Sequence, residues 1–174
     1  MVDAPRIVAL VPMRENSERV PGKNFRPLAG KPLFHHILAS LSAVPEIADI
    51  VVDTDSEIIK SGIADNFPKV LVLDRPESLR AGEVPMNTIL LHDTEMVPAD
   101  FYLQTHSTNP LLRPQTISVA LAAFFVAHPA KDSLFGVTEM HTRLYDAEGR
   151  AINHNPRELL RTQDLPPVYE ENSC

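Results

Sequence analysis

The apolar residues of this chain fall into short blocks of two kinds, which alternate along the sequence. Residues 6–12 (RIVALVP) form, after Arg6, an unbroken apolar block, a pattern typical of a strand that is buried on both faces of a parallel sheet. Residues 114–128 instead carry Ile117, Leu121 and Phe125 at helical spacing, which predicts a helix with one apolar face. The two kinds of block therefore predict strands and helices in turn.

The expected elements follow from these blocks. Strands are expected at residues 6–12, 49–55, 70–73, 100–104 and 133–138, and helices at 32–41, 56–64, 85–96 and 114–128. Pro32 suits the first turn of its helix, where a backbone N–H has no partner, and Ser56 is expected to be an N-cap. A hairpin is expected at 144–152, with Gly149 in its turn. The alternation predicts an α/β fold, a three-layer α/β/α sandwich with a mainly parallel sheet, in a single domain over residues 1–174.

Charge is distributed unevenly along the chain. The whole sequence has 16 Lys and Arg against 23 Asp and Glu, a net charge of −7. Residues 1–32 nevertheless hold six basic and three acidic residues, a net charge of +3, and the rest of the chain has a net charge of −10. A local positive segment indicates either a small anionic ligand or a solvated basic loop. It argues against a nucleic-acid surface, which needs a wide basic face.

Composition excludes several other classes of protein. Cys174 is the only cysteine, so there is no internal disulfide framework and no zinc site with several cysteines. No apolar run reaches the roughly 20 residues that span a bilayer. The N-terminus has no basic segment followed by an apolar stretch and a cleavage site. We therefore expect a soluble cytoplasmic protein without a membrane partner.

The chemistry is expected at the carboxyl ends of the strands, where ligands bind in open parallel sheets. The loop after the first strand has neither the Walker A pattern nor the dinucleotide pattern G-x-G-x-x-G. It does offer three cations and two neutral donors within a short stretch, the groups that a triphosphate needs. These residues are Arg14, Ser17, Arg19, Lys23 and Asn24. Pro21 and Gly22 are expected to stiffen and turn this loop.

The same segment resembles the opening of a known family. Residues 7–24 and 27–33 resemble the start of the acylneuraminate cytidylyltransferases (CMP-sialic acid synthetases), in which a strand precedes the patterns A-R-x-G-S-K-G-[IV]-P-x-K-N and P-L-x-G-K-P-L. Further matching segments keep the family's order, so that the resemblance covers nearly the whole chain. They are residues 52–58, 74–79, 103–111 and 161–169.

This resemblance implies a fold, a reaction and a set of residues. The fold is the Rossmann-like type of the nucleotide-diphospho-sugar transferases. The reaction is the attack of a sugar-acid hydroxyl on the α-phosphate of CTP, assisted by Mg²⁺, to give a CMP-sugar and pyrophosphate. The implied CTP site comprises Arg14, Ser17, Lys23, Asn24 and Arg75, with Arg14 and Lys23 stabilising phosphate charge. The implied sugar-acid contacts are Gln104, Arg161 and Gln163, and the implied assembly is a homodimer. His106 is either a local addition to these contacts or a solvated loop histidine.

The sequence departs from the family pattern in ways that affect the acceptor and the metal. Glu15, Asn16, Glu18 and Arg19 stand where the family has Gly, Gly, Lys and Gly, so the positive charge in the loop is rearranged. Residues 103–111 are two residues longer than the family's L-Q-P-T-S-P-L. Thr162 replaces an arginine and removes a bidentate partner for a carboxylate, so the acceptor is a relative of sialic acid or another acid or sugar.

The family continues beyond the point where this sequence stops, with a strand, a dimerisation element and the aspartates that bind the metal. The chain is therefore expected to be a truncated form, in which Asp53 and Asp55 either substitute as metal ligands or end their strand and cap a helix. Two other functions stay open. One is a nucleotidyltransferase of the same fold that uses UTP, GTP or ATP with a sugar phosphate. The other is a non-catalytic nucleotide-binding domain.

Overall fold

The computed structural model describes residues 4–17 and 19–172. Glu18 and Cys174, which entered the sequence analysis, lie outside the described residues. The chain divides into two compact units, residues 1–132 and residues 133–174.

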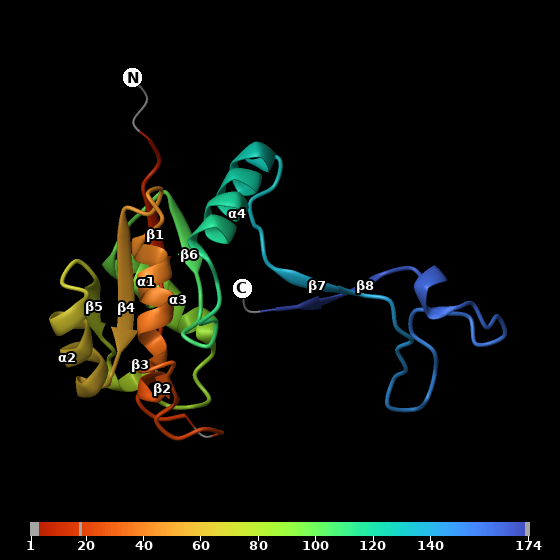
Figure 1. Ribbon diagram of the computed structural model, residues 1–174, viewed down its shortest axis with the longest axis horizontal. Helices are drawn as coiled ribbons and strands as arrows, with labels where there is room; N and C mark the ends of the chain where they lie inside the picture. The colour runs from red at the N-terminus through yellow and green to blue at the C-terminus, as the bar shows by residue number, and fades with distance from the viewer. Residues whose placement is uncertain (1–3, 18, 173–174) are drawn as a thin grey trace. The chain divides into compact units, whose positions relative to one another are not determined.

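The first unit is built on a four-stranded parallel sheet with the strand order β5-β4-β1-β6 (Figure 1). The strands are β1 (Ile7–Leu10), β4 (Asp49–Thr54), β5 (Leu71–Asp74) and β6 (Phe101–Gln104). Every residue of β1 is buried, because this strand lies between two neighbours and has helices over both faces. Its unbroken apolar sequence follows from that position. These four predicted strands are confirmed to within a few residues.

Helices cover both faces of this sheet, as the three-layer prediction requires. They are α1 (Leu33–Ser42), α2 (Glu57–Asn66), α3 (Met86–Met96) and α4 (Pro114–Ala127). Buried residues of α1, α2 and α4 pack in one cluster against Ile7, Ala9 and Val11 of the central segment. Val8 and Leu10, on the other face, pack with Leu90 of α3 and with Val97. The predicted mainly parallel sheet with flanking helices is thus confirmed.

Two local features refine the predicted helix starts. Before α1, a short hairpin pairs β2 (Pro27–Leu28) with β3 (Lys31–Pro32). Its turn residues Ala29 and Gly30 have φ of 48° and 81°, the positive values that two-residue hairpin turns favour. Pro32 therefore precedes the first helical residue instead of occupying the first turn. Ser56 does lie at the N-cap position of α2, but its hydroxyl makes no capping hydrogen bond.

The second unit corrects one prediction and confirms another. The strand expected at residues 133–138 is instead β7 (Val137–Met140), which pairs antiparallel with β8 (Val168–Glu171) and not with the parallel sheet. Leu134 and Phe135, which suggested a buried strand, are exposed. A short apolar block alone cannot distinguish a buried strand from an extended segment. The hairpin at 144–152 is confirmed by the Tyr145–Ala151 bridge.

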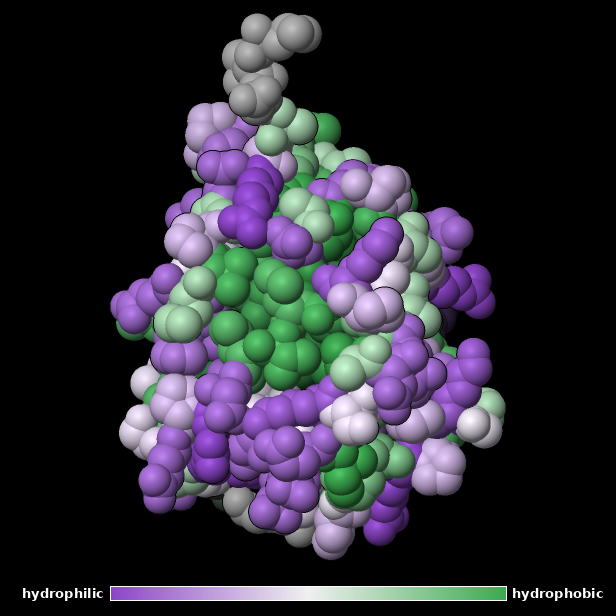
Figure 2. All heavy atoms as spheres, turned by 90° about the vertical axis from the view of Figure 1, so that its left-hand side faces the viewer, coloured by the Kyte–Doolittle hydropathy of each residue, from purple (hydrophilic) through white to green (hydrophobic). Residues whose placement is uncertain are grey.

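The edge strand β5 carries apolar side chains that are not fully covered. Leu71 and Val72 are both exposed. Figure 2, which views the molecule from the side where β5 and α2 lie in Figure 1, shows an apolar area framed by polar side chains.

None of the helices in the described residues has the length and hydropathy to cross a bilayer.

Burial predicts how two leucines differ in their contribution to stability. Leu38 of α1 is fully buried, whereas Leu91 of α3 is 62% exposed. Leu38→Ala is expected to lower the free energy of unfolding by about 2–5 kcal/mol, because it leaves a cavity in the core. The matched control Leu91→Ala is expected to change it by less than about 1 kcal/mol. Urea denaturation followed by circular dichroism measures both values, and equal effects would contradict the assigned core.

Candidate functional site

A cavity of about 420 Å³ lies at the carboxyl ends of the parallel strands. Pockets that hold small ligands usually have volumes of about 300–1,000 Å³. The lining residues come from the loop after β1, the residue after β5, the segment leading into α3 and the loop after β6. They are Pro12, Met13, Arg14, Ser17, Arg19, Lys23, Asn24, Arg75, Ala81, Gly82, Val84, Met86, Ile89, His106, Ser107 and Thr108. The structure therefore brings together all six predicted nucleotide-binding residues.

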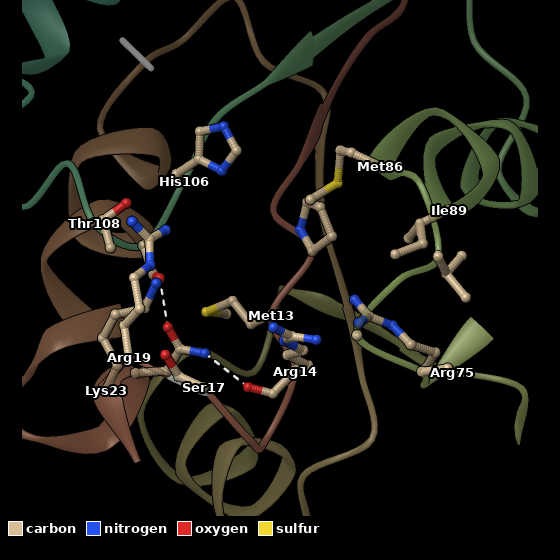
Figure 3. A pocket seen from close by; sticks show the side chains of 16 residues that line it. Met13, Arg14, Ser17, Arg19, Lys23, Arg75, Met86, Ile89, His106 and Thr108 are labelled. Carbon is tan, nitrogen blue, oxygen red and sulfur yellow. Dashed lines mark hydrogen bonds between the residues drawn. The ribbon is translucent and has the colours of Figure 1, made fainter. Parts of the chain in front are cut away.

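The cavity is rich in positive charge. Arg14, Arg19, Lys23 and Arg75 line it, and among the described lining residues there is no Asp or Glu. Figure 3 shows Arg19 and Lys23 on one side of the cavity and Arg75 on the other. Burial, followed by repulsion from Arg19 and Arg14, holds the pKa of Lys23 below its usual value. Crowded cations of this kind favour an anionic ligand, which relieves the repulsion between them.

The loop that carries these cations is held in place by polar contacts from other segments. The side-chain amide of Asn24 donates to the carbonyl of Arg14 over 2.9 Å. Its oxygen accepts a hydrogen bond of 2.6 Å from the hydroxyl of Ser107 (dashed lines in Figure 3). Asp55 accepts a hydrogen bond of 2.8 Å from the backbone of Glu15. Asn24 and Asp55 therefore join this loop to the loops after β6 and β4.

Gly22 supplies the turn that the sequence predicts in this loop. Its φ is +64°, a backbone conformation that residues other than glycine rarely adopt. A Cβ at this position would lie 2.5 Å from Cε2 of the Phe25 ring. Glycine is therefore required here for two reasons, the backbone conformation and the close approach of an aromatic ring.

Arg75 differs from the other cations because it is almost completely buried, with 3% exposure. Its Nε donates to Oδ1 of Asp53, which is itself fully buried at the end of β4. Its Nη2 donates to the backbone carbonyl of the same residue over 3.2 Å. From the sequence, Asp53 is expected only to be a substitute metal ligand or to end its strand. The structure places it instead as the partner that holds Arg75 at the cavity wall.

A metal could be held by one group among the described residues, formed by Asp53, His92 and Asp93, whose donor atoms lie within 4.8 Å of one another. Mg²⁺ prefers an octahedral set of oxygens and keeps several of its waters. Asp53 is fully buried and already paired with Arg75, and His92 offers nitrogen. This group therefore does not fit Mg²⁺.

Of the three residues expected to contact the sugar acid, Gln104 belongs to the same unit as the cavity. It ends β6, and its side-chain nitrogen lies 2.9 Å from Nε2 of His106, which lines the cavity. Burial, followed by the charge of Lys23, lowers the pKa of His106 and favours its neutral form. Gln104 therefore orients an uncharged imidazole at the cavity wall.

Arg161 and Gln163 belong to the second unit, in and beside the 3₁₀ turn Thr162–Asp164. The guanidinium of Arg161 forms two hydrogen bonds to Asp164, of 2.6 and 3.1 Å. Neither residue is among those that line the cavity of the first unit, and their contact with the sugar acid stays a prediction.

Sequence reasoning missed the apolar wall of the cavity. Val84, Met86 and Ile89 line it from α3 and the segment before it, and Met13 adds a fourth apolar side chain. The residues before α3 connect the carboxyl end of β5 to this helix, so they lie near the sheet edge where the cavity is. Gly82 and Pro85, which mark that loop, were the available signal.

Comparison with known proteins adds a family and a fold. A family model described as Cytidylyltransferase matches residues 8–174. The 8-amino-3,8-dideoxy-manno-octulosonate cytidylyltransferase of Shewanella sp. (strain ANA-3) is 28% identical over 161 residues, 91% of this chain and 60% of that protein. The protein of the same name from Shewanella baltica (strain OS155) is 27% identical over 161 residues, with the same coverage. The chain thus spans about 60% of the length of these curated relatives.

Solved structures show the same architecture. The CMP:2-keto-3-deoxy-manno-octonic acid synthetase complexed with CTP superposes with a TM-score of 0.68 at 18% identity, over 96% of this chain and 71% of that chain. A 4-diphosphocytidyl-2C-methyl-D-erythritol synthase gives a TM-score of 0.64 at 14% identity, over 97% and 73% of the two chains. At these identities the likeness concerns the fold.

Two glycines with positive φ test the requirement for Gly22. Gly22→Ala is expected to destabilise the protein by more than Gly30→Ala, because Gly30 has φ +81° but nothing within 4 Å of an added Cβ. The strain that both variants share is about 1–2 kcal/mol. Thermal unfolding of the two variants measures the difference, which reports the clash with Phe25. If Gly30→Ala is the more damaging substitution, the assigned loop conformation is incorrect.

Proposed function

Because this chain belongs to the cytidylyltransferase family, we propose that it transfers the cytidylyl group of CTP to a sugar acid, with release of pyrophosphate. The observation that carries the proposal is that one cavity is lined by four cations and, among the described residues, by no carboxylate. Such a cavity complements a triphosphate. The cytidylyltransferase part of the resemblance is confirmed by the family match, whereas the acylneuraminate part is not, since the relatives reported above are named for octulosonate.

The triphosphate is the part of CTP that these cations bind. Arg14, Arg19 and Lys23 approach it from the loop after β1, and Arg75 from the opposite wall. Ser17 contributes a hydroxyl donor. Asn24, whose amide joins two loops, keeps the cations in position instead of offering a free amide. The apolar wall of Val84, Met86 and Ile89 provides a surface for the uncharged part of the nucleotide.

The reaction makes one bond and breaks another at the α-phosphorus. A hydroxyl oxygen of the sugar acid bonds to that phosphorus and releases its proton to solvent, while the bond from the phosphorus to the bridging oxygen of pyrophosphate breaks. Negative charge grows on the leaving pyrophosphate, where Arg14 and Lys23 stabilise it. Phosphoryl-type transfer depends mainly on this positioning and charge neutralisation. Mg²⁺, when bound with the nucleotide, would add further charge neutralisation, and the described lining residues provide no carboxylate ligand for it.

The acceptor is proposed to be a 2-keto-3-deoxy sugar acid of the octulosonate type. The support is the names of the curated relatives, which specify 8-amino-3,8-dideoxy-manno-octulosonate. Gln104, through its contact with His106, lies next to the cavity. Arg161 and Gln163 are the proposed partners of the carboxylate, which would compete with Asp164 for the guanidinium of Arg161. Nine-carbon acids of the sialic type are the alternative acceptors, and the homodimer stays a prediction.

Pyrophosphate release tests the proposal. The chain, alone and extended to the length of its relatives, is incubated with CTP and Mg²⁺ and with an octulosonate or a nine-carbon acid. We expect release with the octulosonate, and less than a tenth of that rate when UTP, GTP or ATP replaces CTP. Binding of CTP without turnover in the extended protein would instead support the non-catalytic alternative.

A matched pair of lysine variants separates the cavity from general charge effects. Lys23→Ala is expected to weaken CTP binding about 10- to 100-fold, the loss of one charge-assisted contact to phosphate. Lys69→Ala removes the same charge from an exposed position outside the cavity and is expected to have an effect below about twofold. Equal effects of the two substitutions in a calorimetric titration would contradict the assigned site.

A further inference from the structure

Two carboxyl groups meet below the cavity, and the proposed function uses neither of them directly. Asp53 is the second-last residue of β4 and Asp93 lies on α3, with exposures of 0% and 1%. Oδ1 of Asp53 is occupied by Arg75. Oδ2 of Asp53 and Oδ2 of Asp93 are both buried, and neither has a donor if both groups are ionised. Buried oxygens without a partner are costly, so the arrangement calls for one more proton or cation.

The charge balance favours a proton. Arg75 contributes one positive charge, and two ionised carboxylates would leave a buried net charge of −1. A divalent cation would turn that value into +1, whereas one proton on Asp93 gives neutrality. A protonated Asp93 also supplies the missing donor, because its O–H donates to Asp53.

We propose that Asp93 is a positioning residue for Arg75: its neutral carboxyl donates a hydrogen bond to Asp53 and thereby leaves Asp53 to hold the Arg75 guanidinium at the cavity wall. This proposal rests on the proposed function, in which Arg75 contacts the phosphates of CTP.

The surroundings of Asp93 support a neutral form. Burial, followed by the negative charge of Asp53, raises the pKa of Asp93 to about 7. Among the described residues, the groups that face it are Asp53 from β4 and His92 from its own helix. Nδ1 of His92 lies 3.4 Å from Asp93 and 3.9 Å from Asp53. Arg75, which follows β5, acts on Asp93 through Asp53.

Loss of this proton is expected to weaken nucleotide binding. An ionised Asp93 adds a second negative charge beside Asp53, and this charge competes with phosphate for the Arg75 guanidinium. By linkage, CTP binding then raises the affinity of Asp93 for its proton, so that binding at pH 7.5 takes up protons. Calorimetric titration of CTP in two buffers with different ionisation enthalpies measures this uptake.

Two substitutions of Asp93 distinguish a positioning role from a merely structural one. Asp93→Ala removes the donor and is expected to weaken CTP binding about tenfold. Asp93→Asn replaces the donor by an amide that does not titrate, and is expected to restore affinity to within about threefold of the wild type. It should also abolish most of the proton uptake, while His92→Gln retains it. Uptake that persists in Asp93→Asn, or that disappears in His92→Gln, would overturn the proposal.

A measurement without nucleotide separates this inference from the proposed function. The pKa of Asp93 is about 7 in the folded chain, above the usual value of 3.8. Between pH 3.8 and pH 7 the folded chain therefore keeps a proton that the unfolded chain releases. The free energy of unfolding should therefore fall as the pH rises from about 4 to about 7. Asp93→Asn should remove that part of the slope.

The CTP titration and the pH dependence of unfolding give distinct results. If the wild type binds no CTP, the proposed function fails and the positioning role fails with it. The pH dependence of the free energy of unfolding still reports the proton that Asp93 shares with Asp53. An identical slope in the wild type and Asp93→Asn would overturn the shared proton even if CTP binds. Tight binding of Mn²⁺ by the wild type that is lost in Asp93→Asn would show a cation in place of the proton, and would also overturn the proposal.

Discussion

The buried ion pair between Asp53 and Arg75 is the interaction on which the site depends. Asp53 receives Nε of Arg75 on its carboxylate, and its backbone carbonyl accepts from Nη2 of Arg75 and from the backbone of Met13 over 2.8 Å. One residue at the end of β4 therefore fixes the segments that follow β1 and β5. Removing one partner of such a pair leaves an uncompensated buried charge, typically at a cost of about 3–5 kcal/mol.

This pair explains how an acidic chain can hold an anion. The chain as a whole is negative, yet the parallel sheet brings the basic loop after β1 and Arg75, the residue directly after β5, to one edge. Asp53 is not among the residues that line the cavity, and the positive charge of Arg75 balances its negative charge. The cations above it are crowded, as the lowered pKa of Lys23 indicates, and an anionic ligand is the natural counter-charge.

The sequence predicts well what depends on local pattern. The central strand follows from its unbroken apolar block, the loop turn at Gly22 from glycine after proline, and the cation cluster from residues within one loop. What it misses depends on contacts between distant segments. Asp53 and Arg75 are separated by 22 positions, and nothing local indicates that they pair or that Asp93 approaches from α3. The apolar residues at 133–138 resemble a strand of the parallel sheet, but whether a segment joins that sheet depends on its pairing partner. Here β7 pairs with β8 instead.

The central claim is that the cavity selects CTP, and thermal unfolding with each nucleotide tests it most directly. A ligand at 100 times its dissociation constant adds about 2.7 kcal/mol, which corresponds to a rise of about 5–10 °C for a domain of this size. We predict that rise with CTP, and a markedly smaller one with UTP, GTP or ATP at the same concentration. Equal shifts with all four nucleotides, or no shift with CTP, would contradict the account.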